Sequence, residues 1–271
     1  MLMEATMRSS DKKAFTLIEL LVVISIISLL ASVVLASLNA ARENARISAS
    51  AQFEAIVYHG LASEAAANFP LDEGAGAVVT DLTAGITGSL AGPVSWPSAT
   101  YGIASKYALA FNGSSNLVTF TSCAIMNKLI GVSGITSSRW VYLNSLPGVS
   151  YIVDFINQGS GGAGHVVGIN SNGTVNVQAR SAVADSLQSV NGNIALSTGK
   201  WYNVVASVDY VAKTVSIYVN GQLDTKSSAT FLSSTFTPAA CSSQDKIGAS
   251  PTPDRYLDGR VDNYRVYGQA L

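Results

Sequence analysis

Glu19 is the residue whose position most demands a chemical partner. It lies in an otherwise apolar run from Phe15 to Leu38, 24 residues without glycine or proline. As a helix this run spans about 36 Å, enough to cross the hydrocarbon core of a bilayer. A carboxylate inside a bilayer costs roughly 3 kcal/mol. The sequence therefore predicts either a plain membrane anchor whose glutamate reaches the interface, or a carboxylate that pairs with a cation.

Few other residues have types that support chemistry. Histidine occurs only at His59 and His165, which gives little support for histidine-based catalysis or a zinc site. Cys123 and Cys241 are the only cysteines, and in an oxidising compartment they can form one disulfide. The net charge is −1 and charged residues make up 12% of the chain, so no basic patch for nucleic acid is indicated.

The charges before the apolar run predict its orientation. Arg8, Lys12 and Lys13 precede Phe15, and a basic flank places the N-terminal end in the cytoplasm. The run is longer than the apolar core of a secretory signal, and helix-favouring residues follow it instead of a cleavage site. Everything downstream is therefore expected to be exported.

Glycine and proline divide the chain into a helical part and a second domain. Residues 1–59 contain neither, Gly60 is the first glycine and Pro70 the first proline. This shift predicts one helix from Phe15 to about Ala67 and a domain boundary near residues 68–70. In its second half a face of mostly small residues recurs near i, i+4 spacing, formed by Ala45, Ala49, Phe53, Ile56 and Gly60. That face either docks on the chain's own domain or packs against other helices.

The remaining residues, about 200, are expected to form one domain. Asn-Gly pairs, which favour tight hairpin turns, occur at residues 112–113, 172–173, 191–192 and 220–221. Around them apolar residues alternate with polar ones, as in Val215, Ile217 and Val219. No useful helical period appears apart from a short turn around residues 124–129. The pattern predicts an all-β sandwich.

The stretch KKAFTLIELLVVI, from Lys12 to Ile24, resembles the signature of type IV pilins and pseudopilins. The resemblance implies that a prepilin peptidase removes the leader 1–14 between Ala14 and Phe15, and that Phe15 is then N-methylated. Glu19, the fifth mature residue, would pair with the terminal amine of a neighbouring subunit. Ala14 replaces the usual glycine, and the apolar half lacks the proline common in major pilins, which favours a pseudopilin or minor pilin.

Five segments of the second domain occur in a recognisable order. They are FPLDEGAG from Phe69, ALAFNGSSNLV from Ala108, GKWYNVVASVD from Gly199, IYVNG from Ile217 and LDGRVDNYRVYGQAL from Leu257. Together they resemble the laminin-G-like branch of the concanavalin A-like lectin/glucanase superfamily. The resemblance implies a two-sheet jelly roll over residues 69–271, preceded by the leader 1–14 and a pilin-like helix over 15–68, of which 15–38 cross the membrane.

This second resemblance directs attention to carboxylates. Glucanases of the superfamily use a Glu-x-Asp-x-x-Glu strand, but after residue 70 this chain has only Glu73, so we do not expect an enzyme. Relatives often bind one calcium ion between their opening and closing segments, which match Asp72 and Asp262 here. The alternative is that both aspartates order turns.

Three tryptophans complete the candidate residues. Trp140 and Trp201 lie at strand positions typical of the family, so we expect them in the core. Trp96 lies between Pro93 and Pro97 and is the candidate for contact with a ligand.

These observations predict a subunit of a type IV pilus or type II secretion pseudopilus with a lectin-like head for adhesion or substrate binding. Its partners would be other pilin subunits, the prepilin peptidase, membrane lipid, and a glycan or surface protein. It would first be a single-pass protein of the cytoplasmic membrane and then part of an extracytoplasmic filament. Two alternatives stay open: a structural subunit whose jelly roll only covers the shaft, and a membrane-tethered carbohydrate-binding protein.

Overall fold

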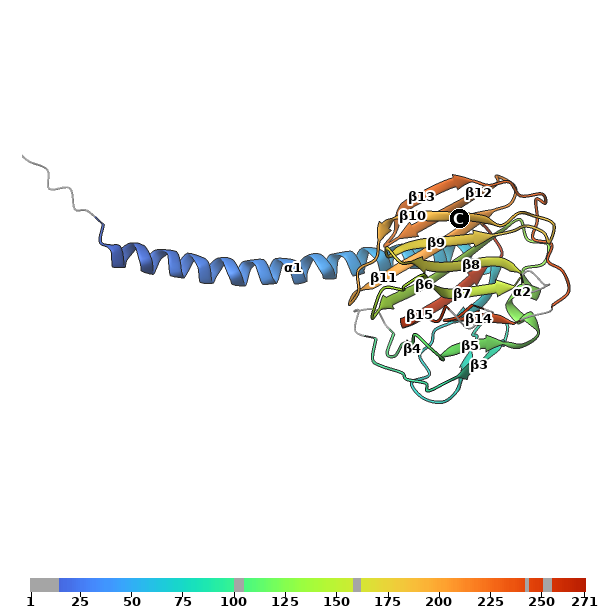
Figure 1. The fold of residues 1–271 in the computed structure, drawn as a ribbon, viewed down its shortest axis with the longest axis horizontal. Coiled ribbons are helices and arrows are strands. Elements are labelled where there is room, and N and C mark those ends of the chain that lie inside the picture. Colours follow the sequence, from blue (N-terminus) through green and yellow to red (C-terminus); the bar gives the residue numbers. More distant parts are fainter. Residues whose placement is uncertain (1–14, 100–104, 158–161, 242–243, 251–254) are drawn as a thin grey trace, which may run out of the picture. The chain divides into compact units, whose positions relative to one another are not determined.

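The computed structural model describes residues 15–99, 105–157, 162–241, 244–250 and 255–271. The chain divides into two compact units, Met1–Ala45 and Arg46–Leu271. Both contain part of helix α1 (Leu17–Leu61), the long blue helix of Figure 1. Ala14, the residue before the predicted cleavage point, and the rest of the leader lie outside the described residues.

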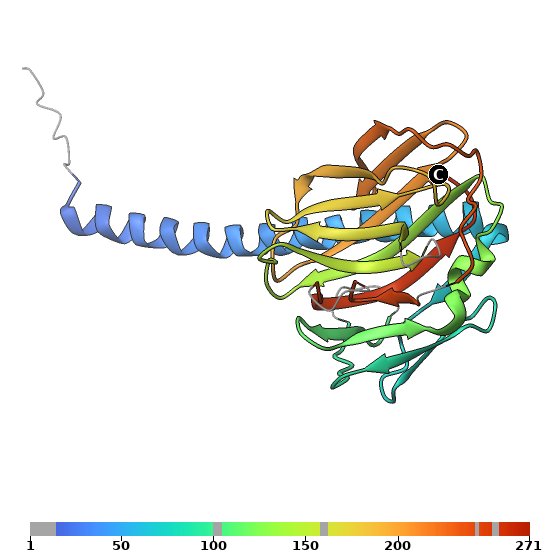
Figure 2. The ribbon, with the colours of Figure 1, turned by 45° about the vertical axis from the view of Figure 1, so that its right-hand side comes forward.

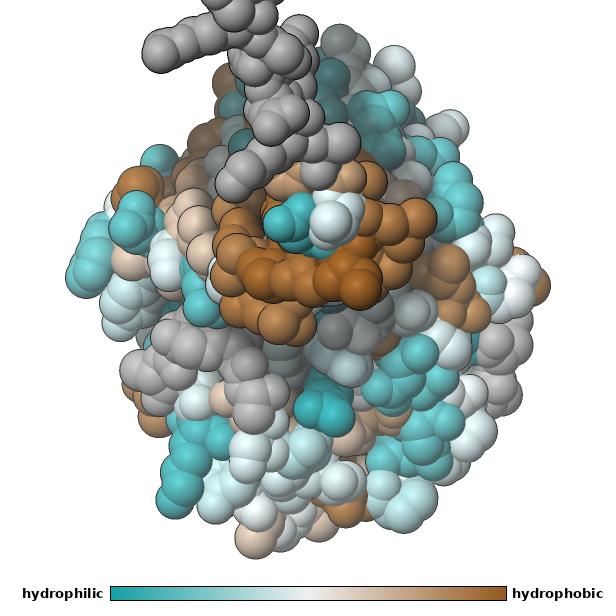
Figure 3. Space-filling model, turned by 90° about the vertical axis from the view of Figure 1, so that its left-hand side faces the viewer, coloured by the Kyte–Doolittle hydropathy of each residue, from teal (hydrophilic) through white to brown (hydrophobic). Residues whose placement is uncertain are grey.

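The described part of the first unit is a bare apolar helix. In Figure 3 brown side chains surround its axis, and Phe15 and Leu17 are 84% and 79% exposed. Four serines of the helix (Ser25, Ser28, Ser32, Ser37) donate their hydroxyls to carbonyls one turn earlier, at 2.7–2.9 Å. These bonds satisfy polar groups that an apolar solvent could not. Within the described chain, this is the one helix long and apolar enough to cross a membrane.

The second unit is built from two antiparallel sheets packed face to face (Figures 1 and 2). In order, sheet A contains β1 (Ala65–Phe69), β15 (Asp258–Tyr267), β6 (Gly134–Leu143), β11 (Trp201–Asp209), β12 (Thr214–Val219) and β13 (Gln222–Ser228), with β4 (Leu109–Asn112) also paired to β15. Sheet B contains β10 (Gln188–Ala195), β9 (Thr174–Ala179), β8 (Ala163–Asn170), β7 (Ser150–Asn157), β14 (Asp245–Ile247), β5 (Leu117–Phe120), β3 (Thr87–Ala91) and β2 (Val78–Thr80). The predicted all-β sandwich is confirmed.

Alternation along the strands produces the core between the sheets. In β11, for example, Val204, Ala206 and Val208 face the opposite sheet and are fully buried. Short helical turns η1 (Ala62–Glu64), η2 (Thr121–Cys123) and α2 (Ala124–Lys128) complete the described elements. The helix α2 confirms the predicted turn at residues 124–129.

Only two of the four Asn-Gly pairs join paired strands. Asn220 and Gly221, with φ of 53° and 79°, connect β12 to β13, and the pair at 172–173 connects β8 to β9. The prediction is wrong for the pair at 191–192, which lies within β10 at a break in register. There Asp224 of β13 accepts the N–H groups of Asn193 and Ile194 at 3.0 Å. A Cβ at Gly192 would clash with this carboxylate, so glycine permits a close approach between the two sheets.

The pair at residues 112–113 is also not a hairpin turn, because the strands on either side belong to different sheets. Asn112 ends β4 in sheet A, and the chain then enters β5 in sheet B. The Asn112 Oδ1 accepts the backbone N–H groups of Ser114, Ser115 and Asn116 at 2.9–3.1 Å. The asparagine therefore stabilises a crossover between sheets.

The helix is shorter than predicted. It ends at Leu61 instead of about Ala67, and β1 begins at Ala65, four residues before the predicted start of the second domain. Alanines favour a helix only weakly, and tertiary contacts override that preference here. The backbone from Ala65 to Phe69 pairs with β15, which leaves Ala67 and Phe69 fully buried.

The second half of α1 packs on the outer face of sheet A with a face that differs from the predicted one. Its buried residues are spaced by three and four: Ile47, Ser50, Glu54, Val57 and Leu61. The predicted face is mostly exposed, and only Phe53 is half-buried. The observed face docks on the sheet because its larger aliphatic residues bury more apolar surface than alanines would. Trp140 and Trp201 are buried as predicted, but against this helix, in a cluster with Ile47.

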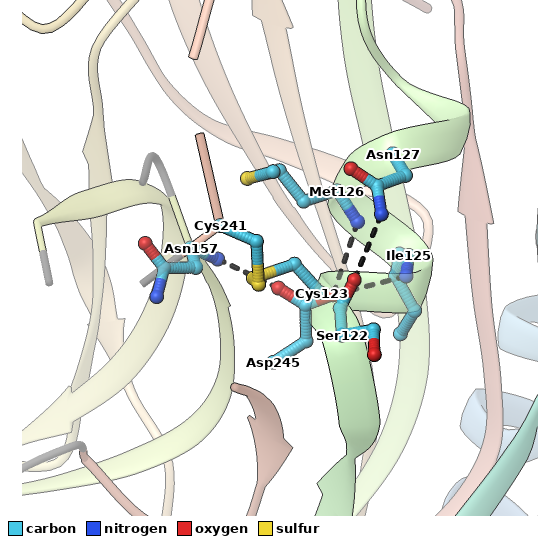
Figure 4. The surroundings of a disulfide bond; sticks show 8 residues. All are labelled: Ser122, Cys123, Ile125, Met126, Asn127, Asn157, Cys241 and Asp245. Atoms are coloured by element: carbon cyan, nitrogen blue, oxygen red, sulfur yellow. Dashed lines mark hydrogen bonds between the residues drawn. A yellow bond between two sulfur atoms is a disulfide. The ribbon is translucent and has the colours of Figure 1, made fainter. Parts of the chain in front are cut away.

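Cys123 and Cys241 form a disulfide with Cα atoms 5.8 Å apart. Figure 4 shows it beside Asp245, whose carboxylate accepts the N–H groups of Ile125, Met126 and Asn157 at 2.9–3.0 Å. Burial raises the pKa of Asp245 to about 6, although these three hydrogen bonds oppose the shift. The disulfide and the aspartate together tie α2 to sheet B.

Candidate functional site

Glu19 closes the first turn of α1 by a reciprocal pair of hydrogen bonds. Its Oε2 accepts the Thr16 N–H at 2.8 Å and the Thr16 hydroxyl at 2.9 Å, while its own N–H donates to the Thr16 Oγ1 at 3.2 Å. This is a capping box, with Thr16 as the cap and Glu19 three residues later. The carboxylate is thus satisfied locally in a single subunit, and it lies one turn from Phe15.

Glu54 links the second half of α1 to sheet A. Its Oε2 accepts the indole N–H of Trp140 at 2.7 Å, and its Oε1 forms a salt bridge with Arg265. The same guanidinium donates to the side-chain oxygens of Asn68 and Asn263, each at 3.1 Å. One buried carboxylate therefore connects the helix to β6 and β15, and through Arg265 to β1.

A pocket of about 280 Å³ lies beside this link. Its lining residues come from both the helix and the head: Ala51, Glu54, Ala55, Tyr58, Asp72, Ser105, Asn263 and Arg265. The centre of the Tyr58 ring lies 5.0 Å from the Arg265 guanidinium, so these two side chains stack at the edge of the pocket. Two residues next to it have left-handed backbones, Leu71 with φ 60° and Asn263 with φ 49°.

The two predicted calcium ligands lie in different settings. The Asp72 Oδ1 accepts the N–H groups of Lys106 and Tyr107 at 2.7 and 2.6 Å and the Ser105 hydroxyl at 3.1 Å. Asp262 is fully buried and accepts the N–H of the next residue at 2.8 Å. In the described ranges no three His, Cys, Asp or Glu residues form a group that could hold a metal.

The groups around Asp72 oppose a cation at its Oδ1. The N–H and O–H groups that point at its Oδ1 carry partial positive charge, and Ca²⁺ requires six to eight oxygen ligands instead. The arrangement is that of an aspartate that orders a loop, which is the alternative stated above. Calcium at Asp72 and Asp262 stays a prediction.

Trp96 is half-buried and packs against the core between the sheets. Its indole N–H donates to the Gly76 carbonyl at 3.3 Å. The loop therefore holds this ring against the domain, which leaves only part of it available to a ligand.

A buried polar cluster between the sheets has no counterpart among the predicted residues. Arg139 and Asp154 form an ion pair at 3.1 Å with both side chains fully buried. Close to them, His165 and Ser137 are hydrogen-bonded at 2.6 Å. Ser137 and Arg139 share the inward face of β6 with Ile135, Val141 and Leu143. Period-two patterning therefore assigns them to the core but does not identify their partners on the opposite sheet.

Burial dominates the titration of this cluster. It raises the pKa of Asp154 to about 6 against the opposing charge of Arg139. Burial, and after it the charge of the nearby Arg139, lowers the pKa of His165 to about 3. At neutral pH the cluster therefore contains an ionised pair beside a neutral imidazole.

Comparison with known protein families identifies the superfamily of the β-sandwich and a motif at the start of the helix. Residues 112–271 match the family model described as the concanavalin A-like lectin/glucanases superfamily. The chain belongs to this superfamily. Residues 9–35 match the prokaryotic N-terminal methylation motif, which covers the predicted cleavage point and Glu19. No curated protein sequence matches the chain.

Solved structures share the fold at low sequence identity. Botulinum neurotoxin type C, in a study of its interaction with two ganglioside molecules, is 16% identical with a TM-score of 0.56, over 79% of this chain and 50% of the toxin chain. Domain 4 of an extracellular arabinanase from Geobacillus stearothermophilus, in complex with arabinotriose, is 17% identical with a TM-score of 0.55, over 77% and 94% of the two chains. The chain thus spans about half the length of the matched toxin chain.

Replacement of Glu54 tests its link to the sheet. We expect Glu54→Leu to lower the free energy of unfolding by about 3 kcal/mol, because it leaves the charge of Arg265 without its carboxylate partner and the Trp140 N–H without an acceptor. Glu54→Gln should cost less, since its amide oxygen can still accept from Trp140. Urea unfolding followed by tryptophan fluorescence measures both. Glu64→Gln, at an exposed glutamate, is the control, and a Glu54→Leu variant as stable as this control would contradict the assignment.

The buried His165 predicts a pH effect. Its pKa is 6.5 ordinarily and about 3 in the fold. Below pH 6.5 the unfolded chain therefore binds a proton that the folded chain does not, and stability falls by up to about 1.4 kcal/mol per pH unit. Asp154 and Asp245, with raised pKa values, act in the opposite direction, but they are present in both proteins of the comparison. We expect the stability of wild type relative to His165→Gln to decline from pH 7 to pH 5.

Urea titrations at each pH measure this difference. His59→Gln, at an exposed histidine, is the matched control for the change of residue type. A difference between wild type and His165→Gln that stays constant over this range would show that His165 titrates alike in the folded and unfolded chains.

Proposed function

We propose that this chain is a subunit of a type IV pilus or type II secretion pseudopilus with a lectin-like head. The observation that carries the proposal is the first half of α1. It is apolar on all sides, is not buried by any of the residues that the structure describes, and contains one carboxylate inside a methylation motif. Such a helix needs lipid first and then the helices of other subunits.

Glu19 is proposed to be the assembly residue. A prepilin peptidase would cut between Ala14 and Phe15 and leave an amine, later N-methylated, at Phe15. The Thr16–Glu19 capping box keeps the carboxylate satisfied in a single subunit. On assembly, the amine of a neighbouring subunit would become its partner, which makes a carboxylate tolerable in an apolar filament core.

The exposed face of the second helix half supports the same role. Ile56 is 66% exposed, and Ala45, Ala49 and Gly60 are exposed beside it once the opposite face has docked on sheet A. Small residues allow helix backbones to approach closely. This face is therefore proposed to pack against neighbouring helices, which is the second of the two uses that the sequence left open.

The head is proposed to bind a glycan or a surface protein. The support is its fold, because proteins of the same fold have been solved with arabinotriose and with rat synaptotagmin II. The proposal assigns no catalysis to the head. Glu73, its only glutamate, lies in an exposed turn where its Oε1 accepts the Thr80 N–H at 2.9 Å.

Mass spectrometry of the mature N-terminus tests the proposal, applied to membranes and to sheared filaments. An N-methylated Phe15 start, recovered in filaments, is the expected result. A chain that still begins at Met1 and stays in the membrane would favour the alternative of a tethered carbohydrate-binding protein.

A variant separates processing from assembly. We expect Glu19→Ala to be cleaved and inserted in the membrane as well as wild type, but to be lost from filaments, because the neighbour's amine has no acceptor. Immunoblots of membrane and filament fractions measure both steps. Ser28→Ala, a loss of one polar side chain in the same helix, serves as the control. Normal amounts of Glu19→Ala in filaments would contradict the role of this carboxylate.

A further inference from the structure

We propose that the pocket between α1 and the head binds a single neutral sugar unit. The inference rests on the proposed function, since it assigns a site to the lectin-like head. The pocket of about 280 Å³ differs from the predicted contact at Trp96 and from the buried Asp262, neither of which lines it.

Its size indicates a small ligand. Ligand pockets for drug-sized molecules begin at about 300 Å³, so this one holds little more than a sugar ring. Ala51 and Ala55, one helical turn apart, create the space on the helix side, because larger side chains there would fill it. Asp72, Ser105 and Asn263 form the opposite wall.

The charged groups of the pocket already have partners within the chain, which favours a neutral ligand. Glu54 is in a salt bridge with Arg265, and Asp72 accepts from the backbone of Lys106 and Tyr107. An anion would therefore find Arg265 already paired with a carboxylate, and a cation would find N–H groups directed at Asp72. Each carboxylate oxygen still has a second lone pair. The Ser105 hydroxyl donates its one proton to Asp72 or to the Tyr107 carbonyl, so toward a ligand it accepts. Sugar hydroxyls can donate to all of these oxygens, so they suit this lining.

Tyr58 adds an apolar surface to these polar groups. Its side chain is half-exposed, and the Arg265 guanidinium lies 5.0 Å from its ring centre. This contact holds the ring at the edge of the pocket, where its remaining surface can pack against sugar C–H groups. An aromatic ring beside hydrogen-bonding groups combines the two features that a sugar ring requires.

The head wall of the pocket is held in place by strained backbone. Leu71 and Asn263 have positive φ angles without being glycine, and the Asn263 N–H donates to the Pro70 carbonyl at 3.2 Å. Such conformations persist only where the surrounding structure enforces them, and they concentrate at functional sites. Because the other wall belongs to α1, the site is complete only while the helix is docked through Glu54.

Binding of free sugars to the full-length mature protein tests the proposal. The protein is kept in micelles of a detergent without a sugar head group. The probes are D-glucose, D-galactose, D-mannose, L-arabinose and N-acetyl-D-glucosamine, followed by saturation-transfer NMR. We expect at least one to bind with millimolar affinity, as suits so small a ligand. The absence of binding by all five would overturn the proposal.

Two variants locate the binding. Ala55→Phe fills the pocket without touching its hydrogen bonds and should abolish sugar binding, while Ala49→Phe, the same change outside the pocket, should not. Ser105→Ala removes one hydroxyl and should weaken binding up to about tenfold. It keeps the test valid if Ala55→Phe fails to fold, as checked by thermal unfolding. Wild-type affinity in both pocket variants would place the sugar elsewhere and overturn the proposal.

Filament assembly is scored separately, so the two proposals can fail independently. An N-methylated Phe15 in filaments together with no sugar binding would overturn the pocket alone. If Ala55→Phe blocked entry into filaments while leaving sugar binding unchanged, the pocket would belong to a contact with a neighbouring subunit instead.

Discussion

The pairing of Glu54 with Trp140 and Arg265 is the constraint on which the second unit depends. A carboxylate that is nearly buried is tolerable only with partners, and here it has an indole N–H and a guanidinium. Because these partners belong to β6 and β15, satisfying Glu54 requires the helix to lie across sheet A in one register. The aliphatic residues Ile47, Val57 and Leu61 supply apolar burial on either side of it.

The same helix contains two carboxylates that are satisfied in different ways. Glu54 finds its partners within the chain, so the helix from Arg46 onward belongs to the head. Glu19 is satisfied by its own helical turn, and the apolar residues around it are exposed in the part of the chain that the structure describes. The division at Arg46 thus separates a part of the helix that is packed against the sheet from a part that needs lipid or other subunits around it. This asymmetry is what a subunit requires if it passes from a membrane into a filament while its head stays intact.

Much of this arrangement follows from the sequence, because it depends on local patterns. The apolar run, the shift in glycine and proline, and the alternation around Asn220–Gly221 each reflect one residue's neighbours along the chain. The docking face could not be found in this way. Glu54 looks like a surface residue until Trp140 and Arg265, more than 80 residues away, are brought beside it. The same holds for the ion pair of Arg139 and Asp154, because patterning can place a position in the core but cannot show which distant charge lies beside it.

The predicted end of the helix was wrong for a related reason. Ala65–Phe69 form a strand that pairs with β15, the last described strand, instead of continuing the helix. The pocket shares this origin. Its two walls lie on either side of the predicted boundary between the helix and the jelly roll, so neither segment alone indicates the pocket. Positions where distant segments exchange hydrogen bonds are therefore the ones that local reasoning missed.

Amide hydrogen exchange of the full chain in micelles, measured at rising urea concentration, tests the central claim most directly. If Glu54 makes the second half of α1 part of the head, residues 47–61 should lose protection in the same cooperative transition as β6 and β15. Loss of protection in residues 47–61 at lower urea, while β6 and β15 stay protected, would show that the helix and the sheets are separate units.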